Sequence, residues 1–309
     1  MATVDHQRDI SIDLTGDVRR RRRESLVKAT FFAAAAVSIL ISVAIVIALI
    51  GKAWAFLSSI ELSQLFSDGW FPRRGRFQLL ALIVHTLMVT GIAMVVAVPF
   101  GLGSAVYLSE YARSGVRRVL KPTLEILAGI PSVVLGFFAL QFITPNIVRG
   151  LFPGAQSANF LAAGIAVGVL TIPLVASVSE DAMRAVPSSL REASYGLGAK
   201  QWHTALRVVF PAAISGIIAA VILGISRAIG ETMVVALAAG LNGIMTFDPT
   251  EGGLTMTGAI ANLAVGSDQV AGDVAAFQSL FFVGLVLFIF TLGLNILSGR
   301  MVRRYRQRY

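Results

Sequence analysis

Six long apolar runs, separated by short polar segments, dominate this chain of 309 residues. An α-helix needs about 20 apolar residues to cross the roughly 30 Å hydrocarbon core of a bilayer. The fifth run continues past Arg227 and Glu231 towards Ala239, whereas the other five contain no Asp, Glu, Lys or Arg. The runs cover residues 29–51, 77–109, 126–148, 150–179, 208–226 and 276–298. This pattern predicts an all-α membrane protein with six transmembrane helices.

The third and fourth runs nearly touch, so helix-breaking residues have to locate the turn between them. Thr144-Pro145-Asn146, Arg149 and Phe152-Pro153-Gly154 predict that turn. The first run could be mistaken for a signal peptide, with Ala53-Trp54-Ala55 as a faint cleavage site. Its length and the 28 residues before it favour a retained helix.

Basic residues gather beside alternate runs, and this asymmetry orients the predicted helices. With both termini in the cytoplasm, the cytoplasmic segments carry 20 of the 26 Lys and Arg residues. The exception is a basic cluster at residues 72–76, which falls on the outer side. Five consecutive arginines at residues 19–23 would suit nucleic acid or anionic lipid. Beside an apolar run, however, they are typical of an orientation signal, and we expect no nucleic-acid partner.

The predicted order of segments follows from the runs and this orientation. It is a basic cytoplasmic tail at 1–28, a first transmembrane helix and outer loop at 29–76, a transmembrane domain at 77–298 and a basic cytoplasmic tail at 299–309. A long cytoplasmic loop at 179–212 lies inside the transmembrane domain.

Composition supports a lipid environment and excludes several kinds of chemistry. Charged residues make up 14% of the chain and hydrophobic residues 56%, whereas soluble domains carry about 25% charged residues. The chain has no Cys, which excludes disulfides and thiolate metal sites, and its three His residues show no metal-ligand spacing. Motifs of phosphate-binding loops, zinc proteases and serine hydrolases are missing. We therefore expect a protein that is not an enzyme and holds no cofactor.

The cytoplasmic loop at 179–212 has the pattern of two short helices. Ser189 and Glu192 have the spacing of a capping box, which predicts a helix start. Gly196 and Gly198 interrupt the pattern, and a second helix is expected to begin near Lys200. A short helix in the loop of a membrane protein is a natural surface for a cytoplasmic partner.

This loop resembles the E-A-A motif of ABC importer permeases, in which E-A-A is followed after three residues by G and after nine more by I-x-L-P. Here Glu192-Ala193-Ser194, Gly198 and the segment from Val208 to Pro211 keep that spacing, with three conservative departures. The resemblance implies the permease fold of type I ABC importers. It also implies that Glu192, Ala193, Gly198 and Pro211 belong to a coupling helix seated in a separate ATPase subunit. ATP would then be bound by that subunit.

Arg227 and Glu231 interrupt the fifth apolar run. Ionisable residues inside a membrane are costly, so they usually face a polar pathway or each other. Four residues apart, the two are expected on one face of a helix. Arginine suits phosphate because its planar guanidinium donates two parallel hydrogen bonds. The residues alone leave open a substrate pathway or a structural ion pair.

The segment from Ser226 to Met233 resembles the R-A-x-G-E-T segment of phosphate permeases of the PstC and PstA type. The segment from Gly129 to Phe138 resembles their G-[IV]-P-S-[IV]-V-x-G segment, and Met233 with Phe137 and Phe138 resembles the PstC type more. The resemblance covers roughly residues 77–298. It implies a PstA-like second permease, two PstB-like ATPase subunits and an extracytoplasmic PstS-like phosphate-binding protein.

The same residues allow other interpretations of the function. A permease for phosphonate, sulfate or molybdate is the main alternative, and a stand-alone channel or secondary carrier is a different class. The acidic, Gly- and Thr-rich segment at 241–275 is expected to be an outer loop, either solvated or in contact with the binding protein.

Overall fold

The structure, a computed structural model, describes residues 18–265 and 274–305, and these are almost entirely helical. The chain divides into two units, Met1–Leu49 and Ile50–Tyr309. The long helices are α1 (Val18–Ser59), α2 (Leu79–Val106), α3 (Ser114–Ala128), α6 (Phe160–Arg184), α10 (Ile214–Ile229), α12 (Met256–Val265) and α14 (Val274–Tyr305). The shorter ones are α4 (Ser132–Phe138), α5 (Arg149–Leu151), α7 (Ser188–Gly196), α8 (Gln201–Thr204), α9 (Phe210–Ala212) and α11 (Met233–Ala238).

Five helices of the described residues are long and apolar enough to cross a membrane. They are Arg23–Ser59, Leu79–Tyr111, Ser132–Leu151, Phe160–Arg184 and Val274–Met301. A sixth span is formed if the pair Gln201–Ala212 and Ile214–Ile229, bent by 73°, counts as one. The prediction of an all-α, six-span membrane protein is confirmed in this form.

The third span differs from its prediction at both ends. It begins after Pro131, because residues 129–131 separate it from α3, and it continues to Leu151. Pro145 does not end it. Of the residues predicted to make the turn, Thr144-Pro145-Asn146 and Arg149 stay helical, whereas Phe152-Pro153-Gly154 follow the end of the span and form the turn. The segment η4 (Ala139–Val148) is π-helical around this proline. Its wider turns accommodate a residue that cannot donate a backbone hydrogen bond.

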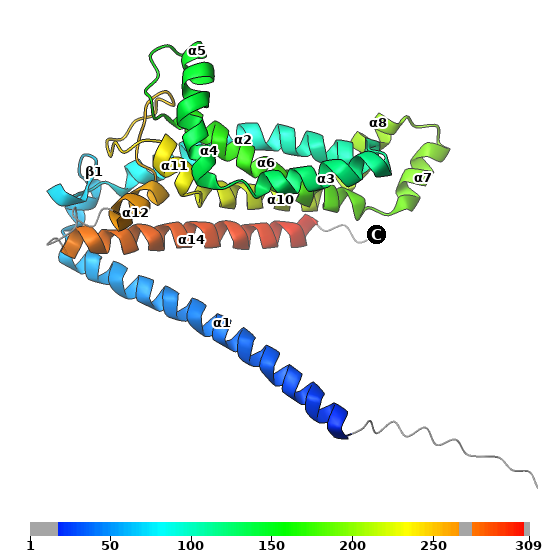
Figure 1. The fold of residues 1–309 in the computed structure, drawn as a ribbon, viewed down its shortest axis with the longest axis horizontal. Helices are drawn as coiled ribbons and strands as arrows, with labels where there is room; N and C mark the ends of the chain where they lie inside the picture. Colours follow the sequence, from blue (N-terminus) through cyan, green and yellow to red (C-terminus); the bar gives the residue numbers. More distant parts are fainter. Residues whose placement is uncertain (1–17, 266–273, 306–309) are drawn as a thin grey trace, which may run out of the picture. The chain divides into compact units, whose positions relative to one another are not determined.

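The helices α2, α6 and α10 lie side by side in the unit Ile50–Tyr309, and α14 runs along α10 (Figure 1). Small residues let α2 and α6 approach closely. A Cβ added at Gly164 would lie 2.6 Å from Ile92, and one at Gly168 would lie 2.8 Å from the Ala93 carbonyl oxygen. Such close helix packing through small residues is typical of membrane proteins.

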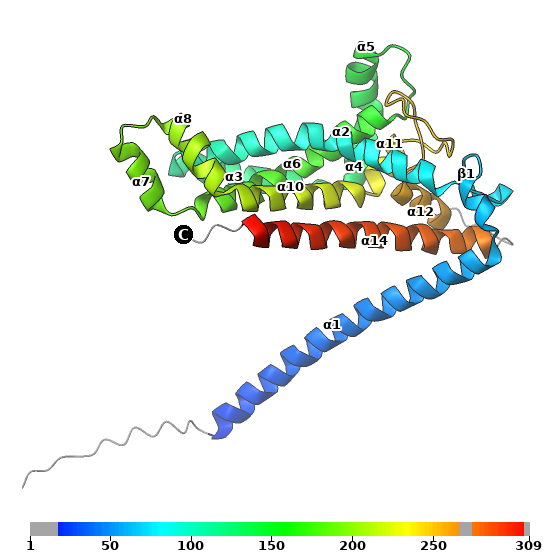
Figure 2. The ribbon, with the colours of Figure 1, turned by 180° about the vertical axis from the view of Figure 1, so that it is seen from behind.

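The two ends of this unit are built differently (Figures 1 and 2). At one end lie α7 and α8. At the other lie α12 and a hairpin of β1 (Trp70–Phe71) and β2 (Arg76–Phe77), which encloses η2 (Pro72–Arg74). The hairpin follows η1 (Leu62–Phe66). Aromatic rings anchor it, since Phe77 lies 4.9 Å from Phe56 and 5.8 Å from Trp70 between ring centroids.

The described part of the segment at 241–275, residues 241–265, is more ordered than the predicted outer loop. Residues 256–265 form α12, and Leu254 to Ala259 are buried, so a fully solvated loop is not what forms. Buried His85 holds the preceding segment, because its Nδ1 donates to the Leu254 carbonyl oxygen and its Nε2 accepts from the Thr246 amide. Two of the four predicted acidic residues, at positions 268 and 273, lie outside the described residues.

Candidate functional site

The helices α7 and α8 form an elbow, residues 188–204, at one end of the long helices. Pro187 occupies the N-cap position of α7, and no side chain caps that end. The capping box predicted from Ser189 and Glu192 is therefore wrong, because the helix begins at Ser188 and Ser189 lies inside it. Gly198 makes the turn between α7 and α8 with φ of 80°, a conformation that favours glycine.

The elbow carries an apolar groove of about 690 Å³ between its two helices. Ala193, Gly198 and Val208 are among its lining residues, together with Leu197 and Trp202, whose exposed fractions are 90% and 52%. Exposed apolar surface of this kind marks a contact with another protein or with membrane.

The structure places the four predicted coupling residues around this elbow. Glu192 and Ala193 are exposed on α7, and Gly198 follows the helix directly. Pro211 lies in α9, just before the 73° bend that leads into α10. The motif therefore covers both arms of the elbow and the bend behind it.

A cluster of charged residues, missed by sequence reasoning, joins α3 to the end of α6 near the elbow. The fully buried Glu180 carboxylate forms ion pairs with Arg117 and, at 3.2 Å, with Lys121. Lys121 also lies 3.0 Å from Asp181. Its hydrogen bond to Asp181 and its proximity to Glu180 raise the pKa of Lys121 above its ordinary value of 10.5. The sequence signal that could have predicted this cluster is Glu180, which directly follows the apolar run at 150–179, together with the basic residues at 113–121.

Arg227 and Glu231 lie on either side of a break in the fifth span. The helix α10 ends at Ile229 with Gly230 as its C-cap, so Glu231 is outside it, and the expected common helix face is wrong. Glu231 instead accepts a hydrogen bond through Oε1 from the Val234 amide at 3.4 Å, at the start of α11. Its carbonyl oxygen accepts from Thr257 of α12 at 2.7 Å.

The Arg227 side chain is exposed on the surface of this chain. Among the described residues, its side chain forms no ion pair or hydrogen bond, with Glu231 or any other group. The neighbouring Ser226 hydroxyl donates to Asn295 of α14 at 3.4 Å. The geometry thus supplies a free guanidinium beside a polar contact, on a helix, α10, that has no other charged residue.

The two sequence segments that resemble phosphate permeases pack against each other. The helix α4, from the first segment, lies against α11, which follows the second. Gly136 allows this contact, since a Cβ there would lie 3.1 Å from the Val234 Cα and 3.2 Å from the Met233 carbonyl oxygen. The helix α4 thereby supports the broken segment that carries Glu231.

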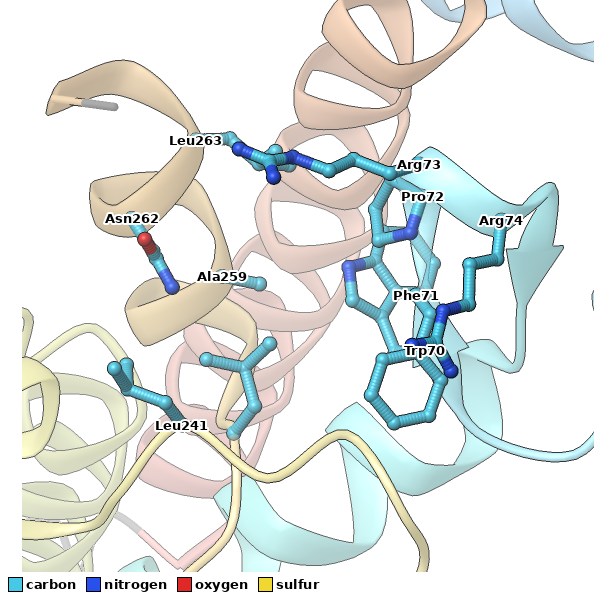
Figure 3. A pocket seen from close by; sticks show the side chains of 10 residues that line it. Trp70, Phe71, Pro72, Arg73, Arg74, Leu241, Ala259, Asn262 and Leu263 are labelled. Carbon is cyan, nitrogen blue, oxygen red and sulfur yellow. The ribbon is translucent and has the colours of Figure 1, made fainter. Parts of the chain in front are cut away.

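A separate cavity of about 320 Å³ lies at the opposite end, between the hairpin and α12 (Figure 3). Trp70, Arg73 and Asn262 line it, and Arg73 extends from the hairpin towards Leu263 on α12 (Figure 3). None of the predicted site residues is among its lining residues. Among the described acidic, His and Cys residues, no group of three or more is placed to hold a metal ion.

Comparison with known proteins identifies the family. The model of the family described as binding-protein-dependent transport system inner membrane component matches residues 97–309. The phosphate transport system permease protein PstC of Mesorhizobium japonicum is 32% identical over 305 residues, covering 92% of each chain. A probable ABC transporter permease protein, YqgH of Bacillus subtilis, is 36% identical over 250 residues, or 79% of this chain and 77% of the relative. PstA 1 of Mycobacterium tuberculosis is 30% identical over 286 residues, covering 93% and 90%.

Solved structures show the same fold. A chain of a bacterial alginate ABC transporter aligns with a TM-score of 0.62 and 17% identity, covering 94% of this chain and 98% of that one. A chain of the MetNI methionine ABC transporter aligns with a TM-score of 0.54 and 19% identity, covering 74% and 94%. The chain therefore belongs to the binding-protein-dependent transport system inner membrane components, as the multi-pass, non-catalytic permease subunit of an ABC importer.

Proposed function

We propose that this chain is the PstC-type permease of an importer of inorganic phosphate, with both termini in the cytoplasm. Relatives that cover more than 90% of the chain are phosphate transport permeases of the PstC and PstA types. The observation that carries the proposal is Arg227, an exposed guanidinium without a partner among the described residues, in a membrane-spanning segment.

Arg227 fits phosphate better than it fits lipid. A charged side chain facing hydrocarbon is costly. We therefore infer that the exposed face of α10 that carries Arg227 borders a polar pathway. Leu223, one turn away, is exposed on the same face. We propose that this face and that of a second, PstA-like permease enclose the pathway, in which Arg227 donates two hydrogen bonds to phosphate. Glu231, whose carboxylate accepts from the Val234 amide at the start of α11, is proposed to line the same pathway.

The elbow is proposed to dock an ATPase subunit. Glu192 and Ala193 provide its exposed face, Gly198 makes its turn, and Pro211 lies where α9 leads into the bend before α10. The apolar groove supplies the buried core that a stable contact needs. The complete importer would contain the two permeases, two PstB-like ATPases and a PstS-like phosphate-binding protein on the outer face.

Transport by the reconstituted importer tests the proposed substrate. Proteoliposomes holding the four kinds of subunit should take up radiolabelled phosphate only with ATP, and a tenfold excess of sulfate or phosphonate should leave uptake unchanged. Inhibition by either competitor would assign another oxyanion. Uptake without ATP would contradict the proposed coupling to an ATPase.

Reversal of charge at the elbow tests the proposed docking. Glu192→Lys should weaken co-purification of the ATPase subunits, because it places a cation on the proposed contact surface. Glu125→Lys is the matched control, since Glu125 is also exposed but lies on α3 rather than on the elbow. Equal retention of ATPase subunits by both variants would refute the docking role.

A further inference from the structure

Arg191 attaches α7 to the body of the transmembrane unit. Its guanidinium pairs with both carboxylate oxygens of Glu110, with Nη2 at 2.9 Å from Oε1 and Nε at 3.2 Å from Oε2. It also donates to the carbonyl oxygens of Val186 at 2.7 Å and Met183 at 2.9 Å. One side chain therefore links α7, the end of α6 and the segment that follows α2.

Glu110 is built into this junction rather than left at a surface. Its side chain is 4% exposed, and that of Arg191 is 20% exposed. Glu110 lies in η3 (Tyr107–Tyr111), which continues α2 directly. The Ser109 hydroxyl donates to its carboxylate at 2.7 Å, and the Gln201 amide of α8 donates to its backbone carbonyl. Both arms of the elbow thus bond to a single residue.

The helix α7 has an attached side and a free side. Leu190, next to Arg191, packs against a buried cluster that includes Ala105, Met183 and Val209. Glu192 and Ala193, the next two residues, are exposed. A helix of nine residues is too short to be stable alone, so its position depends on such contacts. Leu197 and the turn at Gly198 follow it.

We propose that the pair of Arg191 and Glu110 transmits displacement of α7 to α2 and α6. This inference rests on the proposed docking of an ATPase at the elbow. Arg191 is a positioning residue, because its guanidinium faces the interior of this chain while the adjacent exposed residues meet the partner. The bidentate pair fixes direction as well as distance, so a push on α7 moves the long helices instead of swinging the elbow. Lysine offers a point charge and does not reproduce this geometry.

The ratio of ATP hydrolysed to phosphate imported tests the proposal in the reconstituted importer. We expect Arg191→Lys and Glu110→Gln to raise that ratio at least about tenfold, while the ATPase subunits still co-purify at wild-type levels. Arg184→Lys is the matched control, because Arg184 is an exposed arginine in the last turn of α6. It should leave the ratio unchanged.

A double variant separates positioning from general destabilisation. If the two residues act as one link, Glu110→Gln combined with Arg191→Lys should raise the ratio no further than either change alone. An unchanged ratio in both single variants would overturn the proposal, as would loss of the ATPase subunits from either one, since that would place the pair in docking. Failure of the wild type to import phosphate would instead refute the proposed function.

Discussion

Arg191 and Arg227 are two arginines in opposite circumstances within the same chain. Arg191 is mostly buried and forms hydrogen bonds to a carboxylate and two carbonyl oxygens. Arg227 is exposed, and its side chain has no partner among the described residues. A buried charge has to be paired for the fold to tolerate it, whereas a charge that binds a transported anion has to stay available. The contrast separates a charge that holds the structure from one that we propose binds phosphate.

The largest effect is expected at the unpaired arginine. Arg227→Gln should lower phosphate uptake by more than about 100-fold, because two charge-assisted hydrogen bonds of roughly 1.5–3 kcal/mol each are lost. Arg227→Lys should restore part of it, since the charge returns without the planar fork. Both variants should purify with all partner subunits. Normal uptake by Arg227→Gln in proteoliposomes would contradict the proposal that Arg227 binds phosphate.

The next effect concerns the support beneath the broken segment near Arg227. Gly136→Val should destabilise the chain by about 1–3 kcal/mol, because the added side chain meets the backbone of α11. Thermal unfolding of the purified complex measures this change. Gly103→Val is the control, since no atom of the described residues beyond its own turn of helix lies within 4 Å of a Cβ at Gly103. Equal midpoints for the two variants would show that α4 does not hold α11 in place.

A smaller change separates the charge of Glu231 from its hydrogen bond. Glu231→Gln keeps a side-chain oxygen that can accept from the Val234 amide but removes the negative charge. We expect phosphate uptake to fall about tenfold, while the midpoint of thermal unfolding stays at the wild-type value. A lowered midpoint with normal uptake would assign Glu231 to the structure of α11 and leave Arg227 to act alone.

The smallest effect should appear at the paired charges between α3 and α6. The pKa of Lys121 is raised in the folded chain, so its stabilisation is fully present below its ordinary pKa of 10.5 and is lost as pH rises through the folded value. Lys121→Met should lower stability by about 1 kcal/mol. The difference from wild type should stay constant from pH 7 to about pH 10 and shrink only above 10.5. A difference that already declines near neutral pH would contradict this pairing.

Sequence patterns predicted the spans and the turn at Gly198 well, because long apolar runs and a left-handed glycine follow from local chemistry. Other features depended on contacts that a linear pattern does not display. Pro145 did not end a helix, since a π-helical segment accommodates it. Glu231 left the helix of Arg227 because Gly230 ends it.

The attachment of the elbow was the least visible feature in the sequence. Arg191 and Glu110 are 81 residues apart, and only the fold brings their side chains together. The sequence motif predicted Glu192 instead, which lies on the exposed side of the helix. Local spacing thus indicated the surface that we propose for a partner but not the residue that holds that surface in position.

Single-cysteine labelling in the reconstituted importer tests most directly whether the face of Arg227 borders a polar pathway. The chain has no native Cys, so Leu223→Cys on that face and Ile289→Cys on the exposed apolar surface of α14 can be compared cleanly. A charged thiol reagent should modify Leu223→Cys at least about tenfold faster, because a thiol in lipid does not ionise, and phosphate with ATP should change that rate. Equally slow labelling of both variants would place Arg227 against lipid or protein and contradict the account.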